Sequence, residues 1–393
     1  MREDSLKRLA ILGATGSIGM QTLDIVRRYP ELYRAEVLSA GSRVDELAAL
    51  AREFRPSLVV IARRELEGRL RAALEPLGIA VSSGPEALCA AAESPDVDMV
   101  VTATVGYSGL EPTVRAIRAG KEIALANKET LVVAGEYIRR LMAENPSARI
   151  FPVDSEHSAV AQCLAGEDPD KVRRLIITAS GGPFRTWEPA RIAQATAADA
   201  LRHPNWNMGA KITVDSATML NKAFELIEAH YLFDIPAERI EAVVHPQSIV
   251  HSMVEFEDGA IKAQLGVPDM RLPIAYALGR SSRLAGVSEP LSLEKMSNLT
   301  FEAPDERKFP CLGFARLSLE RRGTTACTVN GANEVAVAAF LQGRIPFGRI
   351  YSTIARTLER ATFIANPDFA DYVASNAESR RLAAEELGIA LNN

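Results

Sequence analysis

The sequence contains few cysteines and has no excess of basic residues. Its 393 residues include four cysteines, which are widely scattered and form no CxxC pair: Cys89, Cys163, Cys311 and Cys327. This usage excludes a disulfide-dense secreted domain, indicates a reducing compartment and predicts no structural zinc. The formal net charge of −5 argues against a nucleic-acid-binding protein, which normally carries a basic face. The net charge does not exclude binding of an anionic small ligand, because a pocket can be locally positive.

Long apolar runs are also missing. No window approaches the roughly 20 apolar residues of a membrane span. Residues 1–8 mix acids with bases and do not form the apolar centre of a secretory signal. We therefore expect a cytoplasmic protein that has neither nucleic acid nor a membrane as a partner. Hydrophobic residues make up 47% and charged residues 24%, which excludes a disordered chain and provides ample core material.

The first 150 residues alternate short apolar runs with helical patterns. The runs are rich in aliphatic residues and occupy positions 9–12, 36–40, 58–61, 80–81, 99–101 and 123–125. Apolar strands that alternate with helices predict a parallel sheet covered on both faces. We therefore predict an α/β protein in which residues 1–150 form a Rossmann-like domain.

The remaining residues divide by composition into three further segments. Residues 151–279 carry dense polar motifs, and we expect them to form an α/β catalytic domain. Residues 280–310 are rich in Ser, Pro and Arg and have little periodicity, which is typical of a connecting segment. Residues 311–393 are rich in Ala, Leu, Glu and Arg at helical spacing, which predicts a C-terminal α-helical bundle.

A glycine motif, GATGSIG at residues 13–19, stands between the first predicted strand and the first predicted helix. Glycines there let the backbone approach a pyrophosphate, and the helix N-terminus offers N–H groups and a positive dipole end. The motif in this context predicts a dinucleotide site, with a plain tight turn as the alternative.

The end of the second predicted strand indicates which dinucleotide binds. An NAD site usually has an acidic residue there for the ribose 2′-hydroxyl, but this strand continues into Gly41, Ser42 and Arg43. A hydroxyl followed by a guanidinium suits a 2′-phosphate, because arginine offers a fork of donors. This favours NADP over NAD, with a solvated Arg43 as the alternative.

Two carboxylates follow an apolar run in PVDSEH, residues 152–157. In an extended segment Asp154 and Glu156 would face the same way, whereas His157 would face the opposite side. Two carboxylates that share a direction repel unless a cation lies between them, and oxygen-only ligands suit Mg²⁺ or Mn²⁺. A solvent-facing acidic turn is the alternative.

A third carboxylate lies in a predicted helix over residues 215–231, which we expect to begin at Asp215–Thr218. Asn221, Lys222 and Glu225 share one face of this helix. Glu225 could complete a metal site, while Ser216, Asn221 and Lys222 could hold a phosphate. Taken alone, helix geometry favours a surface pair of Lys222 with Glu225, worth tenths of a kcal/mol.

Three other segments have the composition of ligand loops. Lys128 follows a strand in ANKE, residues 126–129, where an anion or a polarisable oxygen would give it a role. The small residues of ASGGPF, 179–184, could grip phosphate oxygens. HPNWNMG, 203–209, has the make-up of a lid, with Trp206 to exclude water and Gly209 as a hinge.

Together these motifs resemble those of the 1-deoxy-D-xylulose 5-phosphate reductoisomerase family. They occur in the family's order: GATGSIG, LANKET, PVDSEH, ASGGPF, HPNWNMG, VDSATMLNKAFELIEA and HPQSIVHSMV. The resemblance covers nearly the whole chain and is strongest between residues 120 and 275. It implies a homodimer that converts 1-deoxy-D-xylulose 5-phosphate to 2-C-methyl-D-erythritol 4-phosphate in non-mevalonate isoprenoid precursor biosynthesis. The implied cofactors are NADPH and Mg²⁺ or Mn²⁺, with Co²⁺ as a further option.

The resemblance also assigns residues to roles. The implied metal ligands are Asp154, Glu156 and Glu225, which with Lys128 would carry out catalysis. The implied substrate contacts are Lys128, Ser155, Glu156, Ser180, His203, Trp206, Ser216, Asn221, Lys222 and Glu225. The implied NADPH contacts are Gly13, Thr15, Gly16, Ser17, Ile18, Gly41, Ser42, Arg43, Asn127, Glu129 and Gly209. Many members have Asn where this chain has Arg43, and often Lys where it has Ser42.

Two other functions are compatible with a dinucleotide site. Another NADP-dependent dehydrogenase, acting on a phosphorylated aldehyde or hydroxy acid, would need no metal and would be insensitive to a chelator. A non-catalytic NADP-sensing regulator would carry a basic DNA-binding helix pair, and the sequence has no such pair.

Overall fold

The structure is a computed structural model that describes residues 6–206, 208–280 and 282–390. The chain folds into two compact units. Unit 1 comprises the residues up to Asn127, Arg139–Ser158 and Asp269–Glu289. Unit 2 comprises Lys128–Ile138, Ala159–Pro268 and the residues from Pro290 onward. The domain boundaries that we placed near residues 150, 279 and 310 stay a prediction.

Unit 1 is built on a parallel sheet, as predicted. Its strands, among the described residues, lie in the order β4-β3-β2-β1-β5-β6-β7 and all neighbours pair in parallel. Their bounds are β1 (Lys7–Leu12), β2 (Tyr33–Ala40), β3 (Leu58–Ile61), β4 (Ala80–Ser83), β5 (Met99–Thr102), β6 (Glu122–Leu125) and β7 (Arg149–Pro152). The order reverses at β1, which has β2 on one side and β5 on the other, and this is where parallel sheets bind ligands.

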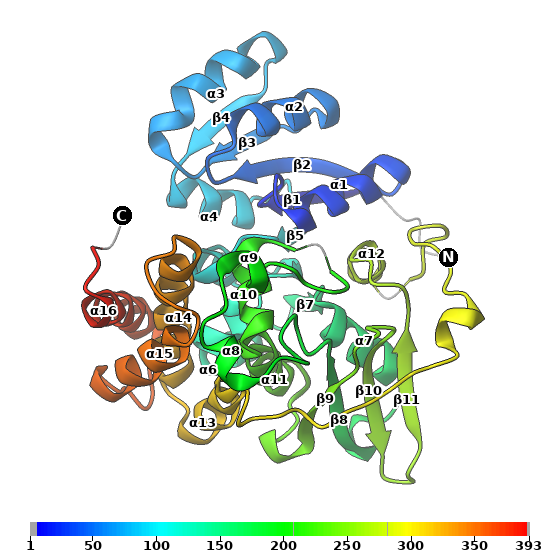
Figure 1. The fold of residues 1–393 in the computed structure, drawn as a ribbon. Coiled ribbons are helices and arrows are strands. Elements are labelled where there is room, and N and C mark those ends of the chain that lie inside the picture. The colour runs from blue at the N-terminus through cyan, green and yellow to red at the C-terminus, as the bar shows by residue number, and fades with distance from the viewer. Residues whose placement is uncertain (1–5, 207, 281, 391–393) are drawn as a thin grey trace. The chain divides into compact units, whose positions relative to one another are not determined.

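Helices cover this sheet and supply its core contacts (Figure 1). They are α1 (Ser17–Arg28), α2 (Val44–Phe54), α3 (Glu67–Leu74), α4 (Pro85–Glu93), α5 (Leu110–Arg118) and α12 (Arg271–Leu278). Leu9 and Ile11 of β1 share a buried cluster with Leu23 of α1 and Ile274 of α12. A segment more than 240 residues away in sequence therefore completes the core beside the glycine loop.

Unit 2 contains a smaller mixed sheet. Its order is β11-β10-β8-β9, with β8 parallel to β9 and the other pairs antiparallel. The bounds are β8 (Val172–Ala179), β9 (Ile240–Val244), β10 (Val250–Phe256) and β11 (Ile261–Leu265). Val160 and Ala229, from the helices α7 (Ser155–Leu164) and α11 (Leu220–Phe233), pack with Leu175 and Val254 of the sheet. The chain passes from unit 2 to unit 1 within α6 (Glu129–Glu144) and back within α7.

The C-terminal residues form the predicted group of helices, which Figure 1 shows in orange and red. They are α13 (Phe314–Arg321), α14 (Thr325–Leu341), α15 (Arg349–Arg360) and α16 (Phe369–Leu387). Three short helices also belong to unit 2: α8 (Pro189–Ile192), α9 (Ala197–Ala200) and α10 (Ala210–Ala217). Val329 and Phe340 of α14 pack in one cluster with Val214 of α10 and Phe224 of α11, so the bundle supports the site helices directly.

The hydropathy of the helices agrees with the absence of apolar runs in the sequence. Within residues 6–206, 208–280 and 282–390, none of the helices is both long enough and apolar enough to cross a bilayer.

Alanine should have opposite effects on the free energy of unfolding at two glycines, Gly13 in the glycine loop and Gly68 in α3. Gly13 has φ +93°, and a Cβ there would lie 2.5 Å from the carbonyl oxygen of Ala103. Gly13→Ala should therefore lower the free energy of unfolding by about 1–3 kcal/mol. Gly68 lies in α3 with open space around it, so Gly68→Ala should raise it by up to about 1 kcal/mol. Urea unfolding measures both, and a neutral Gly13→Ala would contradict this account of the loop.

Candidate functional site

In unit 1 the loop after β1 forms an open helix start. Gly13 N–H donates to Ser39 Oγ at 3.1 Å, and Ala14 N–H donates to the Ser39 carbonyl at 2.7 Å. Gly16 is the N-cap of α1, and none of the described residues caps this helix with a side chain. The N-terminal N–H groups and the positive dipole end of α1 therefore suit an anion such as a pyrophosphate.

Two further residues assigned to the dinucleotide flank this part of unit 1. The Arg43 guanidinium donates to the Thr15 carbonyl at 3.1 Å, which places this cation beside the glycine loop. Asn127 Nδ2 donates to the carbonyls of Thr104 at 3.0 Å and Gly106 at 2.9 Å. Arg43 thus lies beside the glycine loop, and Asn127 connects the end of β6 to the segment after β5.

The segment with two carboxylates is not extended, and this expectation was wrong. β7 ends at Pro152, and Glu156 lies in the first turn of α7. The Asp154 carbonyl accepts from Ser158 N–H at 2.8 Å, so Asp154 stands at the helix start, where an acidic residue is favourable. Ser155 Oγ donates to Glu156 Oε2 at 2.6 Å. Both carboxylates keep partly exposed positions.

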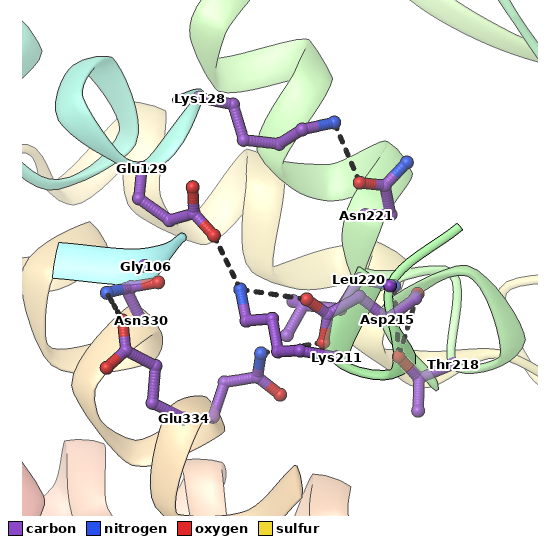
Figure 2. Close-up of polar contacts among 12 residues, drawn as sticks. Gly106, Lys128, Glu129, Lys211, Asp215, Thr218, Leu220, Asn221, Asn330 and Glu334 are labelled. Atoms are coloured by element: carbon purple, nitrogen blue, oxygen red, sulfur yellow. Dashed lines mark hydrogen bonds and ion pairs between the residues drawn. The ribbon is translucent and has the colours of Figure 1, made fainter. Parts of the chain in front are cut away.

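In unit 2 the third carboxylate is buried among cations. Glu225 is 1% exposed, Lys222 4% and Lys128 6%. Lys128 Nζ donates to Glu225 Oε1 and to Asn221 Oδ1, each at 2.8 Å, and Figure 2 shows the second contact. Asn221 Nδ2 also donates to Glu225 Oε1, at 2.5 Å, and Lys222 Nζ donates to Glu225 Oε2. Lys222 does pair with Glu225, as helix geometry alone indicated, but the expected surface position is wrong because the pair is buried.

The helix over residues 215–231 is in fact two helices. α10 ends at Ala217, and α11 begins at Leu220 after Met219, whose φ of 62° is rare for a residue with a side chain. Leu220 N–H, at the first position of the new helix, donates to Thr218 Oγ1 at 3.2 Å. This corner puts Ser216 at the end of one helix and Asn221 and Lys222 in the first turn of the next.

A serine and a histidine meet at the end of β8. Ser180 Oγ lies 3.0 Å from His203 Nε2 and accepts from Gly182 N–H at 3.1 Å. His203 Nδ1 accepts from the N–H groups of Asn205 at 3.2 Å and Trp206 at 3.0 Å, so the ring proton is on Nε2. Burial lowers the pKa of His203 to about 4, which keeps the ring neutral. Ser180 accepts twice, and its own hydrogen can donate to a ligand.

The glycines of this loop place Ser180 near Ser216. Gly181 and Gly182 have φ of +81° and +66°, and a Cβ on Gly182 would lie 2.7 Å from the Ser216 carbonyl oxygen. Only a residue without a side chain permits this approach. The structure therefore brings the loop that carries Ser180 against Ser216, at the corner where Asn221 and Lys222 begin the next helix.

The predicted lid residues lie close to the sheet of unit 2. The rings of Trp206 and His251 are 6.1 Å apart between centroids. Gly209 is the N-cap of α10, and its carbonyl accepts from Thr213 N–H at 3.1 Å and Thr213 Oγ1 at 2.9 Å. Asn207, in the middle of the predicted lid, lies outside the described residues.

Comparison with known proteins settles the family. Three family models match successive parts of the chain: 1-deoxy-D-xylulose 5-phosphate reductoisomerase over residues 9–135, its C-terminal domain over residues 150–233, and the DXP reductoisomerase C-terminal domain over residues 265–382. A 1-deoxy-D-xylulose 5-phosphate reductoisomerase from Bacteroides thetaiotaomicron is 54% identical over 98% of both chains. The chain belongs to the 1-deoxy-D-xylulose 5-phosphate reductoisomerase family.

Other members agree in sequence and in structure. The reductoisomerase of Chloroherpeton thalassium is 51% identical over 96% of this chain and 97% of its own. The Zymomonas mobilis enzyme, in complex with NADPH, is 43% identical with a TM-score of 0.90 over 97% of this chain and 99% of its own. A reductoisomerase in complex with NADPH, fosmidomycin and magnesium is 40% identical with a TM-score of 0.92 over 98% of both.

These comparisons confirm the predicted family, the α/β fold class and the reductoisomerase function. The expected NADPH and magnesium match the ligands of the two related structures. The roles of individual residues stay predictions.

The sequence analysis did not identify Lys211, which lies between Glu129 and Asp215. Lys211 Nζ lies 2.7 Å from Glu129 Oε1 and 2.9 Å from Asp215 Oδ2 (Figure 2). By itself burial would raise the pKa of Glu129, but Lys211 lowers the pKa below its ordinary value. The i,i+4 spacing of Lys211 and Asp215 was the available signal. The predicted helix began at Asp215, so Lys211 lay outside it and the pair of Lys211 with Asp215 was not recognised.

The buried histidines predict how the stability of this protein depends on pH. Burial lowers the pKa of His251 to about 4, although hydrogen bonds with the backbone of Val267 and Gly266 act in the opposite direction. An unfolded histidine has a pKa of about 6.5, so the unfolded chain binds more protons between these values. The free energy of unfolding should be fully retained above about pH 6.5 and should fall towards pH 4, by up to about 1.4 kcal/mol per pH unit for His251.

Urea unfolding between about pH 4.5 and about pH 7.5 measures this slope. His251→Gln should make the slope shallower, because the variant has no ring to protonate at this position in the unfolded chain, while His203 still contributes. His230→Gln is the matched control, since His230 is only partly buried and has its Nδ1 2.7 Å from the Ile235 carbonyl near the end of α11. Equal slopes for His251→Gln and the wild type would contradict the prediction.

Proposed function

We propose that this chain converts 1-deoxy-D-xylulose 5-phosphate to 2-C-methyl-D-erythritol 4-phosphate, using NADPH and a divalent metal ion. The observation that carries the proposal is the cluster around Glu225 in unit 2, where Lys128, Asn221 and Lys222 surround a carboxylate that is 1% exposed. Such a preorganised set of donors suits a small, oxygen-rich anion. Membership of the family supplies the identity of that anion.

Asp154, Glu156 and Glu225 are the proposed metal ligands. All three offer carboxylate oxygens, and this donor set fits Mg²⁺ or Mn²⁺ better than zinc. Asp154 and Glu156 stand together at the start of α7, in partly exposed positions. A divalent ion held there would supply a Lewis acid for substrate oxygens, and bound NADPH would supply a hydride.

Four residues of unit 2 are proposed to hold the substrate phosphate. Ser180 accepts hydrogen bonds from His203 and Gly182, and so it has its hydroxyl hydrogen available for a phosphate oxygen. Ser216, Asn221 and Lys222 lie at the α10–α11 corner, where the N-terminus of α11 adds a positive dipole end.

Lys128 and the lid are proposed to act at the reacting end of the substrate. Lys128 Nζ would donate to substrate oxygens and could hold or deliver a proton there, since the same nitrogen now donates to Asn221 and Glu225. His203, Ser155 and Glu156 would line the rest of the site. Trp206 would close over it and exclude water, because the aldehyde between rearrangement and reduction needs protection from hydration.

The NADPH contacts are proposed to begin at the glycine loop. Gly13, Thr15, Gly16, Ser17 and Ile18 would bind the pyrophosphate at the open start of α1. Gly41, Ser42 and Arg43 would take the 2′-phosphate, with Arg43 already held at the Thr15 carbonyl. Asn127, Glu129 and Gly209 complete the proposed set.

We further propose that the protein acts as a homodimer in the cytoplasm and that Mn²⁺ can replace Mg²⁺. The family resemblance supports the dimer, and the shared oxygen-ligand preference supports the metal exchange. The four cysteines are free and buried, as suits a reducing compartment. Light scattering of the purified protein tests the dimer.

Incubation with 1-deoxy-D-xylulose 5-phosphate, NADPH and Mg²⁺ tests the proposed activity. NMR should identify 2-C-methyl-D-erythritol 4-phosphate, and a chelator should stop both product formation and NADPH oxidation. NADPH oxidation that is undiminished by the chelator would favour a metal-independent dehydrogenase, and absence of the branched product would refute the proposal.

Glu225→Gln should lower kcat at least about 100-fold, on the order of what loss of one group that stabilises developing charge costs. NADPH binding, followed by fluorescence, should persist because Glu225 is not among the proposed NADPH contacts. Glu257→Gln is the matched control, since Glu257 makes an exposed pair with Lys171 at 3.4 Å. A Glu225→Gln variant with the activity of Glu257→Gln would disprove the metal assignment.

Ser180→Ala should raise KM for the sugar phosphate about 10-fold or more, because a hydrogen bond to a charged group contributes about 1.5–3 kcal/mol. Its kcat should change less than KM. Ser352→Ala, which removes only a hydroxyl bonded to the Arg349 carbonyl in α15, should leave both constants unchanged. An unaltered KM for Ser180→Ala would contradict the phosphate assignment.

A further inference from the structure

Lys211 occupies an unfavourable position for a cation unless anions surround it. It lies in the first turn of α10, near the positive end of the helix dipole, and its side chain is 18% exposed. Burial alone would lower the pKa of Lys211, but Asp215 and Glu129 raise it above its ordinary value. The Lys211 ammonium also lies 5.6 Å from the centre of the Phe224 ring in α11. Lys211 is therefore a charged link between three helices, α6, α10 and α11.

Both carboxylates that hold Lys211 are neighbours in sequence of proposed substrate contacts. Glu129, the first residue of α6, directly follows Lys128. Asp215 directly precedes Ser216, and its other oxygen accepts from Asn333 Nδ2 of α14 at 2.8 Å. Asn333 is 0% exposed, so this hydrogen bond fixes Asp215 against the C-terminal bundle. The ion pairs of Lys211 therefore connect Glu129, which follows Lys128, with Asp215, which precedes Ser216.

The same lysine lies at the end of the predicted lid. Gly209, the last lid residue, is two positions before Lys211, and its carbonyl is held by Thr213 of the first turns of α10. The orientation of α10 therefore determines where the chain leaves the lid. Lys211 links α10 to α6, because it bridges Asp215 on α10 and Glu129 on α6.

We propose that Lys211 is a positioning residue for catalysis, which bridges Glu129 and Asp215 and thereby fixes the places of Lys128, Ser216 and the lid end at Gly209. This role rests on the proposed function, since it acts through residues assigned there to the substrate. Lys211 itself is not expected to touch the substrate. A misplacement of about 1 Å at reacting groups can lower a rate on the order of 100-fold, so a residue that holds them in place affects kcat.

The experiment uses Trp206 as a reporter of the lid. The chain has two tryptophans, and the other one, Trp187, packs against Phe184 and Arg191. In a Trp187→Phe parent, Trp206 is therefore the sole tryptophan. Its emission is recorded on addition of 1-deoxy-D-xylulose 5-phosphate and Mg²⁺ without NADPH, and kcat and KM are measured separately with NADPH. The parent must form the branched product, and its failure to do so would count against the proposed function and not against Lys211.

Lys211→Met in this parent should lower kcat about 10- to 100-fold while KM for the sugar phosphate changes less than about 3-fold. The change in Trp206 emission should be reduced or lost. Lys211→Arg, which can still bridge two carboxylates, should restore kcat to within about 3-fold of the parent. Lys262→Met is the matched control, because Lys262 makes an exposed pair with Glu167 at 2.9 Å, and it should match the parent in every readout.

Lys211→Met leaves Glu129 and Asp215 facing each other, and the variant could lose its fold through their repulsion. Lys211→Met/Asp215→Asn removes that repulsion and should show the same loss of kcat with a native circular dichroism spectrum. Either variant with the kcat and emission response of Lys262→Met would overturn the proposal. Unfolding of both would also overturn it, because Lys211 would then serve the fold and not the positioning of the site.

Discussion

The need to compensate the buried Glu225 carboxylate constrains the rest of unit 2. An isolated charge in a protein interior costs several kcal/mol, so a carboxylate that is 1% exposed requires cations at hydrogen-bond distance. Lys222 meets this need from the same helix, and Lys128 meets it from the start of α6, more than 90 residues earlier. Electrostatics therefore holds the two segments together at the point where ligand oxygens are proposed to bind. The global charge of −5 gave no indication of this local concentration of cations.

Two backbone features bring the remaining polar groups to this place. Met219, with φ of 62°, ends α10 and redirects the chain into α11, which sets Asn221 and Lys222 in a first turn. Gly182 lets the loop after β8 come against Ser216. Strained or unusual backbone of this kind persists only where the surrounding structure supports it, here through the cluster shared by α10, α11 and the C-terminal helices. The bundle thus contributes to the site by packing behind its helices.

Much of this arrangement could be predicted from the sequence, and the errors have physical causes. Apolar runs revealed the parallel sheet, because strands buried on both faces leave a strong signal. The extended reading at Asp154 failed because it neglected that an acid at a helix start is favourable, as the Asp154 carbonyl contact to Ser158 N–H illustrates. The helix break at Met219 could not be predicted, since methionine favours helices and positive φ there is imposed by packing. Lys211 went unnoticed because the predicted helix began after it, at Asp215, and because its other partner, Glu129, is 82 residues distant.

Direct measurement of metal binding tests the central claim that Glu225, which accepts hydrogen bonds from Lys128 and Lys222, is a metal ligand. Mn²⁺ binding can be followed by electron paramagnetic resonance in the wild type, Glu225→Gln, Asp154→Asn and the control Glu257→Gln, each with NADPH present. The account predicts one bound ion in the wild type and the control, and at least about 10-fold weaker binding in Glu225→Gln and Asp154→Asn. Mn²⁺ affinity in Glu225→Gln equal to that of Glu257→Gln would contradict it.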